Sequence, residues 1–350
     1  MQNTRNHTTR VTMDDVARVA GVSRATVSRV MTGNSSVSKE TIARVNDAIS
    51  SLGYVPNAAA QTLAGRKNEI PTVGLLLRNP ASTYYGFFYS QLQRQSEEAG
   101  FQLVASVPTI RGRTADELSA LDRMLKLGVN GIFLATGSIR PSDVELLLDT
   151  VPMISVGRPE LHDEITAISY DEDAHGEIMA NNVIYHGHQT VCVVNVPAEV
   201  SPSESHRSLA MIRTLREAGV DVAVVDAGGD SKRMATIKRV LELVSSGRAT
   251  CVMFPADDRA LQFIDYCTMA GLKIPEAVSV TGVDGVFPRW QDLGLATLRL
   301  PVDGVVARAS QVMGSRLENP RQPVVHETLV GHFVPGRTLA TAHQFSGGGR

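Results

Sequence analysis

The sequence predicts a small all-α head followed by a larger α/β body of two similar lobes, each built on a doubly wound parallel sheet. Two patterns predict this architecture. Between Val11 and Gly53, apolar residues recur at helical spacing between residues that typically cap helices. From Thr72 onward, short apolar runs alternate with longer helical stretches in two successive series, as buried parallel strands and their connecting helices do.

Charge divides the chain in the same way. Residues 1–68 carry nine Lys and Arg against four Asp and Glu, a net charge of +5, whereas the remainder carries 25 against 32, a net charge of −7. A basic head on an acidic body is expected of a protein whose head meets a polyanion. The sequence has no apolar run of about 18 residues and no signal-peptide pattern, so we expect a cytoplasmic protein with no membrane contact.

The head is expected to contain three helices over residues 11–55. A side chain that can accept a hydrogen bond from the backbone precedes each helix, and a glycine ends the first and the third. The predicted caps and stops are Thr12 with Asp15 in a capping box, Gly21, Ser23, Ser38 and Gly53.

The first two helices, joined at Gly21, predict a helix-turn-helix whose second helix has the right size for a DNA major groove. Arginine can contact guanine with two hydrogen bonds, and hydroxyl groups can donate to phosphates. Spacing alone leaves an ordinary helical hairpin with a solvated face as the alternative. The positions predicted to contact DNA are Thr12, Ser23, Arg24, Ala25, Thr26, Ser28 and Arg29.

The two series in the body predict the order of its strands and helices. Ligands of such folds lie beyond the carboxyl ends of the strands, so we expect a binding cleft between the lobes. The first series is VGLLL, helix 87–99, FQLVASV, helix 115–127, GIFLA, helix 141–149 and PMISV. The second is helix 174–185, VCVVNV, helix 205–218, VAVVDA, helix 233–245, ATCVMF, helix 258–269 and AVSVTGVD.

The head resembles the DNA-binding domain of the LacI/GalR family of bacterial transcription regulators. The resemblance is carried by VTMDDVARVAGVSRATVSRVM, by the GYVPN connection and by the A-x-x-LAG hinge within residues 11–67. It extends more loosely to residue 335, and the body resembles periplasmic sugar-binding proteins. The resemblance implies a homodimeric repressor of sugar or related catabolic genes that binds palindromic operator DNA under the control of a small-molecule effector.

The resemblance also assigns roles to individual residues of the head. Arg24, Ala25 and Arg29 fall on the base-reading positions of the family. Residues 56–71 form the hinge helix and linker, and Leu63 matches the leucine that is wedged into the minor groove, where it bends the duplex. The hinge residues expected to contact DNA are Asn57, Ala60 and Leu63.

Effector-binding residues are expected at strand ends of the body, residues 72–340. Arg207 falls on the arginine of an R-x-x-G-aromatic pattern, although Ala210 and Met211 replace its last two residues. Carboxylates and a guanidinium together clamp vicinal hydroxyls, so we expect a sugar, sugar acid or nucleoside-like effector. Each residue alone is equally consistent with a helix cap or a surface ion pair. The predicted set is Tyr84, Tyr85, Asp171, Arg207, Asp257, Asp284, Phe287 and Trp290.

The sequence contains no clear motif for other classes of function. The sequence lacks G-x-x-x-x-G-K-S/T, G-x-S-x-G, H-E-x-x-H and G-x-G-x-x-G signatures, so we expect neither an enzyme nor a cofactor. His186 and His188 lack convergent ligands, so we expect no metal. The alternatives that stay open are a global regulator steered by a protein co-regulator and a sugar-binding protein without a regulatory role.

Residues 1–10 and 341–350 are expected to be flexible. The C-terminal tail has no leucine heptads, so we expect no coiled-coil tetramer.

Overall fold

The computed structural model divides the chain into two compact units. One consists of Met1–Glu69, which contains the head, together with Leu125–Gly128, and the other consists of Ile70–Met124 and Val129–Arg350 and is the body. The hinge residues Asn57, Ala60 and Leu63 lie outside the described part of the chain. The structure describes residues 11–31, 37–52, 54, 70–108, 114–136, 139, 141–148, 150–158, 163–228, 233–286, 294–320 and 322–342.

The head contains helices α1 (Met13–Ala20), α2 (Arg24–Met31) and α3 (Lys39–Leu52). The predicted capping box is present, because the Asp15 amide donates to Thr12 Oγ1 at 3.3 Å and the Thr12 amide donates to Asp15 Oδ2 at 2.9 Å. Gly21 ends α1 in the left-handed conformation, φ 64°, which favours glycine. A small core joins the three helices through Val16, Ala17, Ala20, Val27, Val45 and Ala48.

The first lobe of the body is built on a sheet in which all neighbouring strands are parallel, in the order β11-β5-β4-β3-β1-β2. Its strands are β1 (Thr72–Leu77), β2 (Gln102–Ser106), β3 (Gly131–Ala135), β4 (Met153–Val156), β5 (Thr166–Tyr170) and β11 (His326–Leu329). Its helices are α5 (Thr83–Glu98), α6 (Thr114–Lys126), α7 (Pro141–Val144) with a 3₁₀ turn at Glu145–Leu147, and α13 (Val302–Glu318).

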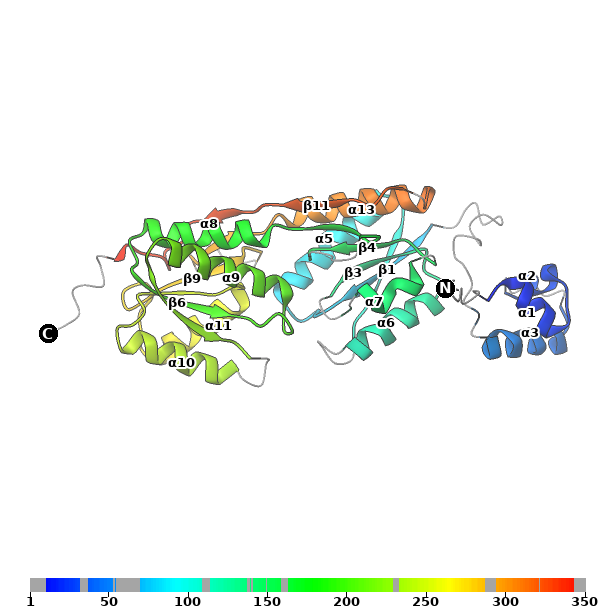
Figure 1. The fold of residues 1–350 in the computed structure, drawn as a ribbon, viewed down its shortest axis with the longest axis horizontal. Helices are drawn as coiled ribbons and strands as arrows, with labels where there is room; N and C mark the ends of the chain where they lie inside the picture. The colour runs from blue at the N-terminus through cyan, green and yellow to red at the C-terminus, as the bar shows by residue number, and fades with distance from the viewer. Residues whose placement is uncertain are drawn as a thin grey trace, which may run out of the picture. The chain divides into compact units, whose positions relative to one another are not determined.

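The second lobe repeats this plan, with the strand order β12-β10-β9-β8-β6-β7 and only β12 antiparallel to its neighbour among the described strands. Helices α8 and α9 cover one face of the sheet, and α10 and α11 cover the other (Figure 1). The strands are β6 (Thr190–Asn195), β7 (Asp221–Asp226), β8 (Cys251–Met253), β9 (Ser279–Asp284), β10 (Ala296–Arg299) and β12 (His332–Val334). The helices are α8 (Glu172–Tyr185), α9 (Pro202–Glu217), α10 (Arg233–Ser245) and α11 (Asp257–Met269).

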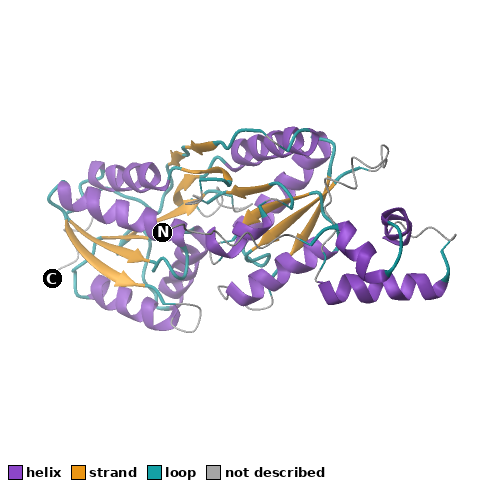
Figure 2. Cartoon of the chain, turned by 45° about the vertical axis from the view of Figure 1, so that its right-hand side comes forward, coloured by secondary structure: helices purple, strands orange, loops and turns teal. Residues whose placement is uncertain are grey.

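The predicted architecture is confirmed, and helices flank both sheets (Figure 2). The predicted series differs in detail, because β5, β10, α13, β11 and β12 were not anticipated. Helices α5, α8, α9 and α11 also begin one to four residues earlier than predicted. Their first turns carry polar side chains beside the strand ends, which the apolar pattern alone does not reveal.

Among the described residues, three segments cross between the lobes. They connect β5 to α8, β10 to α13, and β11 to β12. Helix α13 therefore packs on α5, β4 and β5 of the first lobe, although the chain reaches it from the second. The crossings lie close together, since a Cβ on Gly331 would lie 2.2 Å from the Arg299 carbonyl oxygen.

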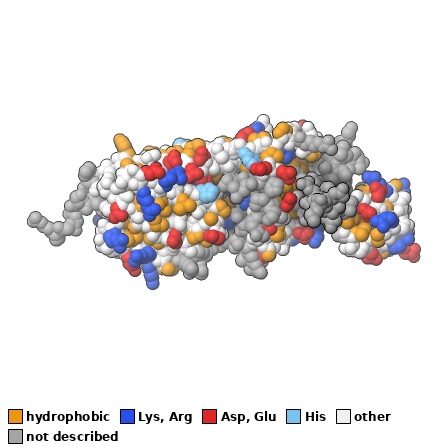
Figure 3. Space-filling view, viewed as in Figure 1, with side chains coloured by type: hydrophobic (Ala, Val, Ile, Leu, Met, Phe, Trp, Pro, Cys, Tyr) orange, Lys and Arg blue, Asp and Glu red, His pale blue; other side chains and the backbone are white. Residues whose placement is uncertain are grey.

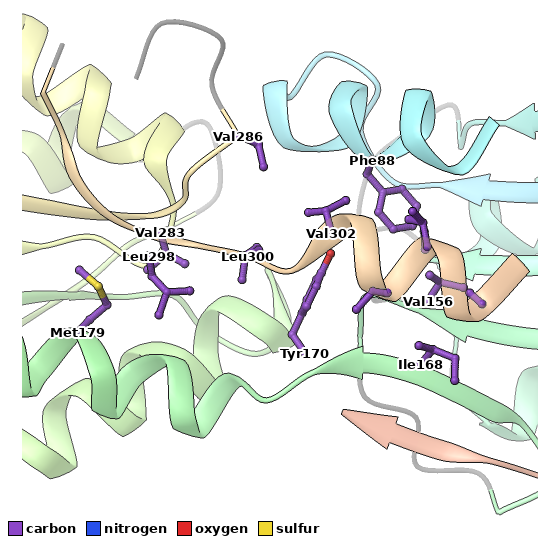
Figure 4. Close-up of a cluster of buried hydrophobic side chains, with 14 of the residues drawn as sticks. Phe88, Val156, Ile168, Tyr170, Met179, Val283, Val286, Leu298, Leu300 and Val302 are labelled. Atoms are coloured by element: carbon purple, nitrogen blue, oxygen red, sulfur yellow. The ribbon is translucent and has the colours of Figure 1, made fainter. Parts of the chain in front are cut away.

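A hydrophobic core runs through the junction of the two lobes. Figure 4 shows Tyr170, Leu300 and Val302 on the crossing segments between Phe88 of the first lobe and Val283 of the second. All three cysteines are buried and unpaired. No helix in the described part of the chain is long and apolar enough to cross a membrane.

Candidate functional site

Helix α2 presents most of the predicted DNA-contacting residues on its solvent-facing side. Ser23, Arg24, Ala25 and Arg29 are exposed and Thr26 and Ser28 are half-buried, whereas Val27 is fully buried against the other helices. The residues predicted to read bases therefore project from the helix while its apolar face is anchored. This is the arrangement that a helix needs to enter a groove without unfolding its domain.

Capping hydrogen bonds fix the start of this helix. The Thr26 amide donates to Ser23 Oγ at 3.1 Å, and the two hydroxyl oxygens lie 2.9 Å apart. Arg24 lies 3.5 Å from Asp14, but both side chains are about two-thirds exposed, at 68% and 67%. An exposed pair of this kind holds its arginine weakly, so a phosphate or a base can replace the aspartate.

In the body, the two lobes touch directly across the predicted cleft. Arg78, which follows β1, donates to the carbonyl oxygen of Val200 in the second lobe. Ser82 Oγ donates to Asp258 Oδ2 at 3.0 Å. Both contacts join the segment between β1 and α5 to second-lobe residues that follow β6 and β8, so the carboxyl ends of the two sheets face each other.

Tyr84 and Tyr85 begin helix α5 beside this contact. The Tyr84 hydroxyl donates to the Tyr170 hydroxyl at 2.9 Å, and the rings of Tyr84 and Tyr85 lie 5.0 Å apart edge to face. Burial raises the pKa of all three phenols, so they stay neutral hydrogen-bonding groups.

Asp257 and Asp284 lie together at the ends of β8 and β9. Asp257 accepts from Thr297 Oγ1 at 2.7 Å and from the Gly285 amide at 2.8 Å, and Asp284 accepts from the Asp257 amide at 3.3 Å. Burial raises the pKa of Asp257 to about 6. Burial, and then the neighbouring Asp257, raises the pKa of Asp284 well above its usual range. Asp284 also adopts φ 141°, a conformation that side chains rarely take.

Arg207 is buried beside these carboxylates. Its guanidinium forms a two-pronged pair with Glu172, with Nε to Oε2 at 2.8 Å and Nη2 to Oε1 at 2.9 Å. Its Nη1 donates to the carbonyl oxygen of Pro255, two residues before Asp257. Arg207 therefore lies near Asp257 and Asp284 at the ends of the second-lobe strands, close enough for its charge to act on both carboxyl groups.

The remaining predicted effector residues stand apart from these three or outside the described chain. Asp171 caps α8, accepting from the Ala174 amide at 2.9 Å, which matches its alternative interpretation as a helix cap. Phe287 and Trp290 lie outside the described residues.

Several residues of the site were missed by the sequence analysis. Glu172 contacts the predicted Arg207, His175 contacts Glu172, and Arg78 and Asp258 join the lobes. Glu172 and Asp258 each follow a predicted aspartate directly, so an acidic pair at a helix start was the available signal. The contact between Glu172 and Arg207 joins residues 35 positions apart, which no local pattern encodes.

His186 and His188 both have partners within the protein, and His186 Nδ1 lies 2.7 Å from the Asn182 carbonyl oxygen. His188 is fully buried and lies 2.9 Å from Thr250 Oγ1 and 3.0 Å from the Ala340 carbonyl oxygen, so both ring nitrogens have protein partners. No cluster suited to a metal ion occurs among the described residues.

Comparisons with known proteins match both units of the chain. Residues 12–57 match the model for bacterial regulatory proteins of the lacI family, and residues 180–339 match a periplasmic binding protein-like domain. Catabolite control protein A of Priestia megaterium is 29% identical over 281 residues, 78% of this chain and 82% of that protein. The transcriptional repressor PurR of Pectobacterium carotovorum is 27% identical over 331 residues, 91% of this chain and 95% of that protein.

Among solved structures, the fold is similar to that of a lac repressor dimer bound to operator and an anti-inducer. The TM-score is 0.67 at 22% identity, with 95% of this chain and 100% of that chain covered. The two relatives just described are named as a catabolite control protein and a transcriptional repressor. The head therefore matches the lacI family of bacterial regulatory proteins, the body matches a periplasmic binding protein-like domain, and relatives of 29% and 27% identity span most of the chain.

Proposed function

We propose that the protein is a sequence-specific transcription repressor of sugar or related catabolic genes, whose operator affinity is controlled by a small hydroxylated effector. The observation that carries this proposal is the solvent-facing side of α2, where Arg24, Ala25 and Arg29 are exposed while Val27 anchors the helix. In a helix-turn-helix, the exposed side of the second helix is the part that enters the major groove. DNA as the target places the protein in the cytoplasm.

The operator is proposed to be a palindrome read by a homodimer. Two identical heads bind two identical half-sites, so the symmetry of the site follows from that of the protein. The lac repressor structure to which this fold is similar is a dimer bound to operator, which supports the proposal. Asn57, Ala60 and Leu63 are proposed to contact the minor groove between the half-sites, with Leu63 bending the duplex.

The effector is proposed to bind where the lobes meet. Tyr84, Arg207 and Asp284 offer a phenol, a guanidinium and a buried carboxyl group in one region, which suits a ligand rich in hydroxyl groups. Tyr85, Asp171, Asp257, Phe287 and Trp290 complete the proposed effector-binding set.

Control of DNA binding follows from the direct contacts between the lobes. A ligand entering this region changes the contacts of Arg78 with Val200 and of Ser82 with Asp258, and with them the relative angle of the lobes. Coupling of this kind between two sites is typically worth about 1–3 kcal/mol.

The test of DNA reading compares a selected palindromic operator with a scrambled duplex. Arg29→Ala is expected to reduce the affinity ratio of the two by about tenfold, because a base contact affects only the specific complex. Arg18→Ala is the matched control, since Arg18 lies on α1 and is 73% exposed. Equal losses on both duplexes would make Arg29 a phosphate contact. A wild-type protein that prefers no palindrome over bulk DNA would contradict the proposed function.

A further inference from the structure

We infer that the cleft selects uncharged, hydroxyl-rich effectors over anionic ones such as sugar acids and sugar phosphates, and that Glu172 sets this preference. The inference rests on the proposed function, because it assigns a chemical class to the effector of the same site. It narrows the expected sugar, sugar acid or nucleoside-like ligand to the uncharged members of that group.

The first step is that Glu172 already occupies the edge of Arg207 that would bind an anion. Guanidinium recognises carboxylates and phosphates best through two parallel hydrogen bonds from one edge. In this protein, Glu172 receives both of them, at 2.8 Å and 2.9 Å, and the two side chains are 2% and 4% exposed. With Nη1 directed at the Pro255 carbonyl oxygen, Nε and both Nη atoms of Arg207 already donate to protein acceptors, so its Nε–Nη2 edge is not free for an anionic ligand.

The second step is that Glu172 is held in place from its other side. The Gly331 amide donates to Nε2 of His175 at 2.8 Å, so the proton of the neutral ring lies on Nδ1. That Nδ1 lies 3.2 Å from Glu172 Oε2 and donates to it. Burial disfavours the charge on Glu172, but Arg207 and His175 hold its pKa below the usual range, so the carboxylate stays ionised.

The third step concerns three further described arginines, each near a strand end or the contact between the lobes. Arg259 pairs with Glu204 at 2.6 Å, and Arg78 donates to Val200. Arg299 donates to the Gly285 carbonyl oxygen and lies over the ring of Phe87. Each guanidinium therefore has partners that an incoming anion would have to displace.

The carboxyl groups of Asp284 and Asp257 differ from Arg259, because they form no salt bridge among the described residues. Asp284 is only 9% exposed, and its neighbour Asp257 is bonded to a hydroxyl and an amide rather than to a cation. An anionic ligand would meet like charge here in a poorly solvated place. A hydroxyl group can donate to Asp284 in addition to the Asp257 amide that already does so, and it brings no charge.

Two experiments test the inference. The first measures binding of matched pairs to the wild-type protein by calorimetry, using D-glucose with D-glucuronate and D-ribose with D-ribose 5-phosphate. We expect the neutral member of any pair that binds to do so at least about tenfold more tightly, because the anion gains no guanidinium edge. Tighter binding of the anionic member would overturn the inference.

The second experiment does not depend on knowing the effector. Glu172→Gln removes the charged partner of Arg207, so the guanidinium becomes able to bind an anion. Sulfate at tens of millimolar is therefore expected to raise the Tm of this variant by about 3 °C relative to sodium chloride of equal ionic strength. Glu177→Gln is the matched control, because Glu177 lies on the same helix, 49% exposed, and pairs with Arg213 at the surface. The wild-type protein and this control are expected to show no such rise.

A third variant guards against failure of Glu172→Gln to fold. Glu172→Asp keeps the buried charge but withdraws the carboxylate from Arg207, and an intermediate sulfate response is expected. Sulfate responses equal to that of Glu177→Gln in every Glu172 variant that folds would overturn the inference. If these variants gain the response while no sugar of either kind alters the wild-type protein, the charge assignment stands and effector control by sugars is what fails.

Discussion

The head and the body hold their charged side chains in opposite ways. In the head, Arg24 and Asp14 form a pair that is about two-thirds exposed, whereas in the body Glu172 and Arg207 form a pair that is almost fully buried. Exposed pairs contribute little to stability and exchange partners readily, but a buried pair becomes costly as soon as one member is removed. The head therefore keeps its charges available for a partner, whereas the body builds this pair into its core.

On the described surface of the second lobe, charged side chains are exposed as they are in the head, unlike the buried pair of Glu172 and Arg207. Figure 3 shows acidic and basic side chains interspersed over it, in keeping with the exposed pair that Arg213 makes with Glu177. Burial is thus what separates the pair of Glu172 and Arg207 from the exposed pairs of both regions.

The largest expected effect comes from breaking the buried pair. Arg207→Met leaves Glu172 without its main partner, so the free energy of unfolding of the body should fall by about 3–5 kcal/mol. Urea denaturation gives the total, and hydrogen exchange resolved by mass spectrometry assigns it to peptides of the body. Arg213→Met, at a surface pair, is the control and should change little. Equal effects of the two substitutions would show that the buried pair is no more costly to break than an exposed pair, which would remove the contrast drawn above.

A second substitution uses pH to sharpen the comparison. Because the pKa of Asp284 is raised, the folded state must either bind a proton at this carboxyl group or bury its charge. In the unfolded chain the same carboxylate is ionised in water and carries neither cost. This penalty is present at neutral and higher pH and fades as pH falls toward 3.8, the ordinary value for aspartate. Asp284→Asn should therefore raise Tm at about pH 8, and the gain should shrink by about pH 5.

The control for this substitution is Asp173→Asn, because Asp173 is 62% exposed on α8. Its Tm should follow that of the wild-type protein at every pH. A gain for Asp284→Asn that did not depend on pH would point to relief of the φ 141° conformation instead, since asparagine tolerates positive φ well.

The smallest expected effect is in the head. Thr12→Ala removes the capping box of α1 and should lower the stability of the head by about 1 kcal/mol. Faster hydrogen exchange should appear in peptides of α1 and leave those of the body unchanged. Val19→Ala, at a half-exposed position of the same helix, is the matched control.

The two regions also differ in how far the sequence predicts them. The caps at Thr12 and Ser23 act within three residues, so a local pattern is sufficient to find them. The partner of Arg207 could not be found in this way, because it depends on how α8 packs against α9. Strand β11 was missed for a related reason, since its place in the first sheet is set by β5, far earlier in the chain.

The three crossings decide how the body can be divided. Because α13 and β11 belong to the first lobe yet follow most of the second in sequence, neither lobe is a continuous stretch of chain. A protein truncated after β5 would lack an edge strand and a covering helix of its sheet. The first lobe can be produced alone only by splicing residues 70–170 to residues 302–329, and a protease that cuts one crossing leaves the halves tethered by two.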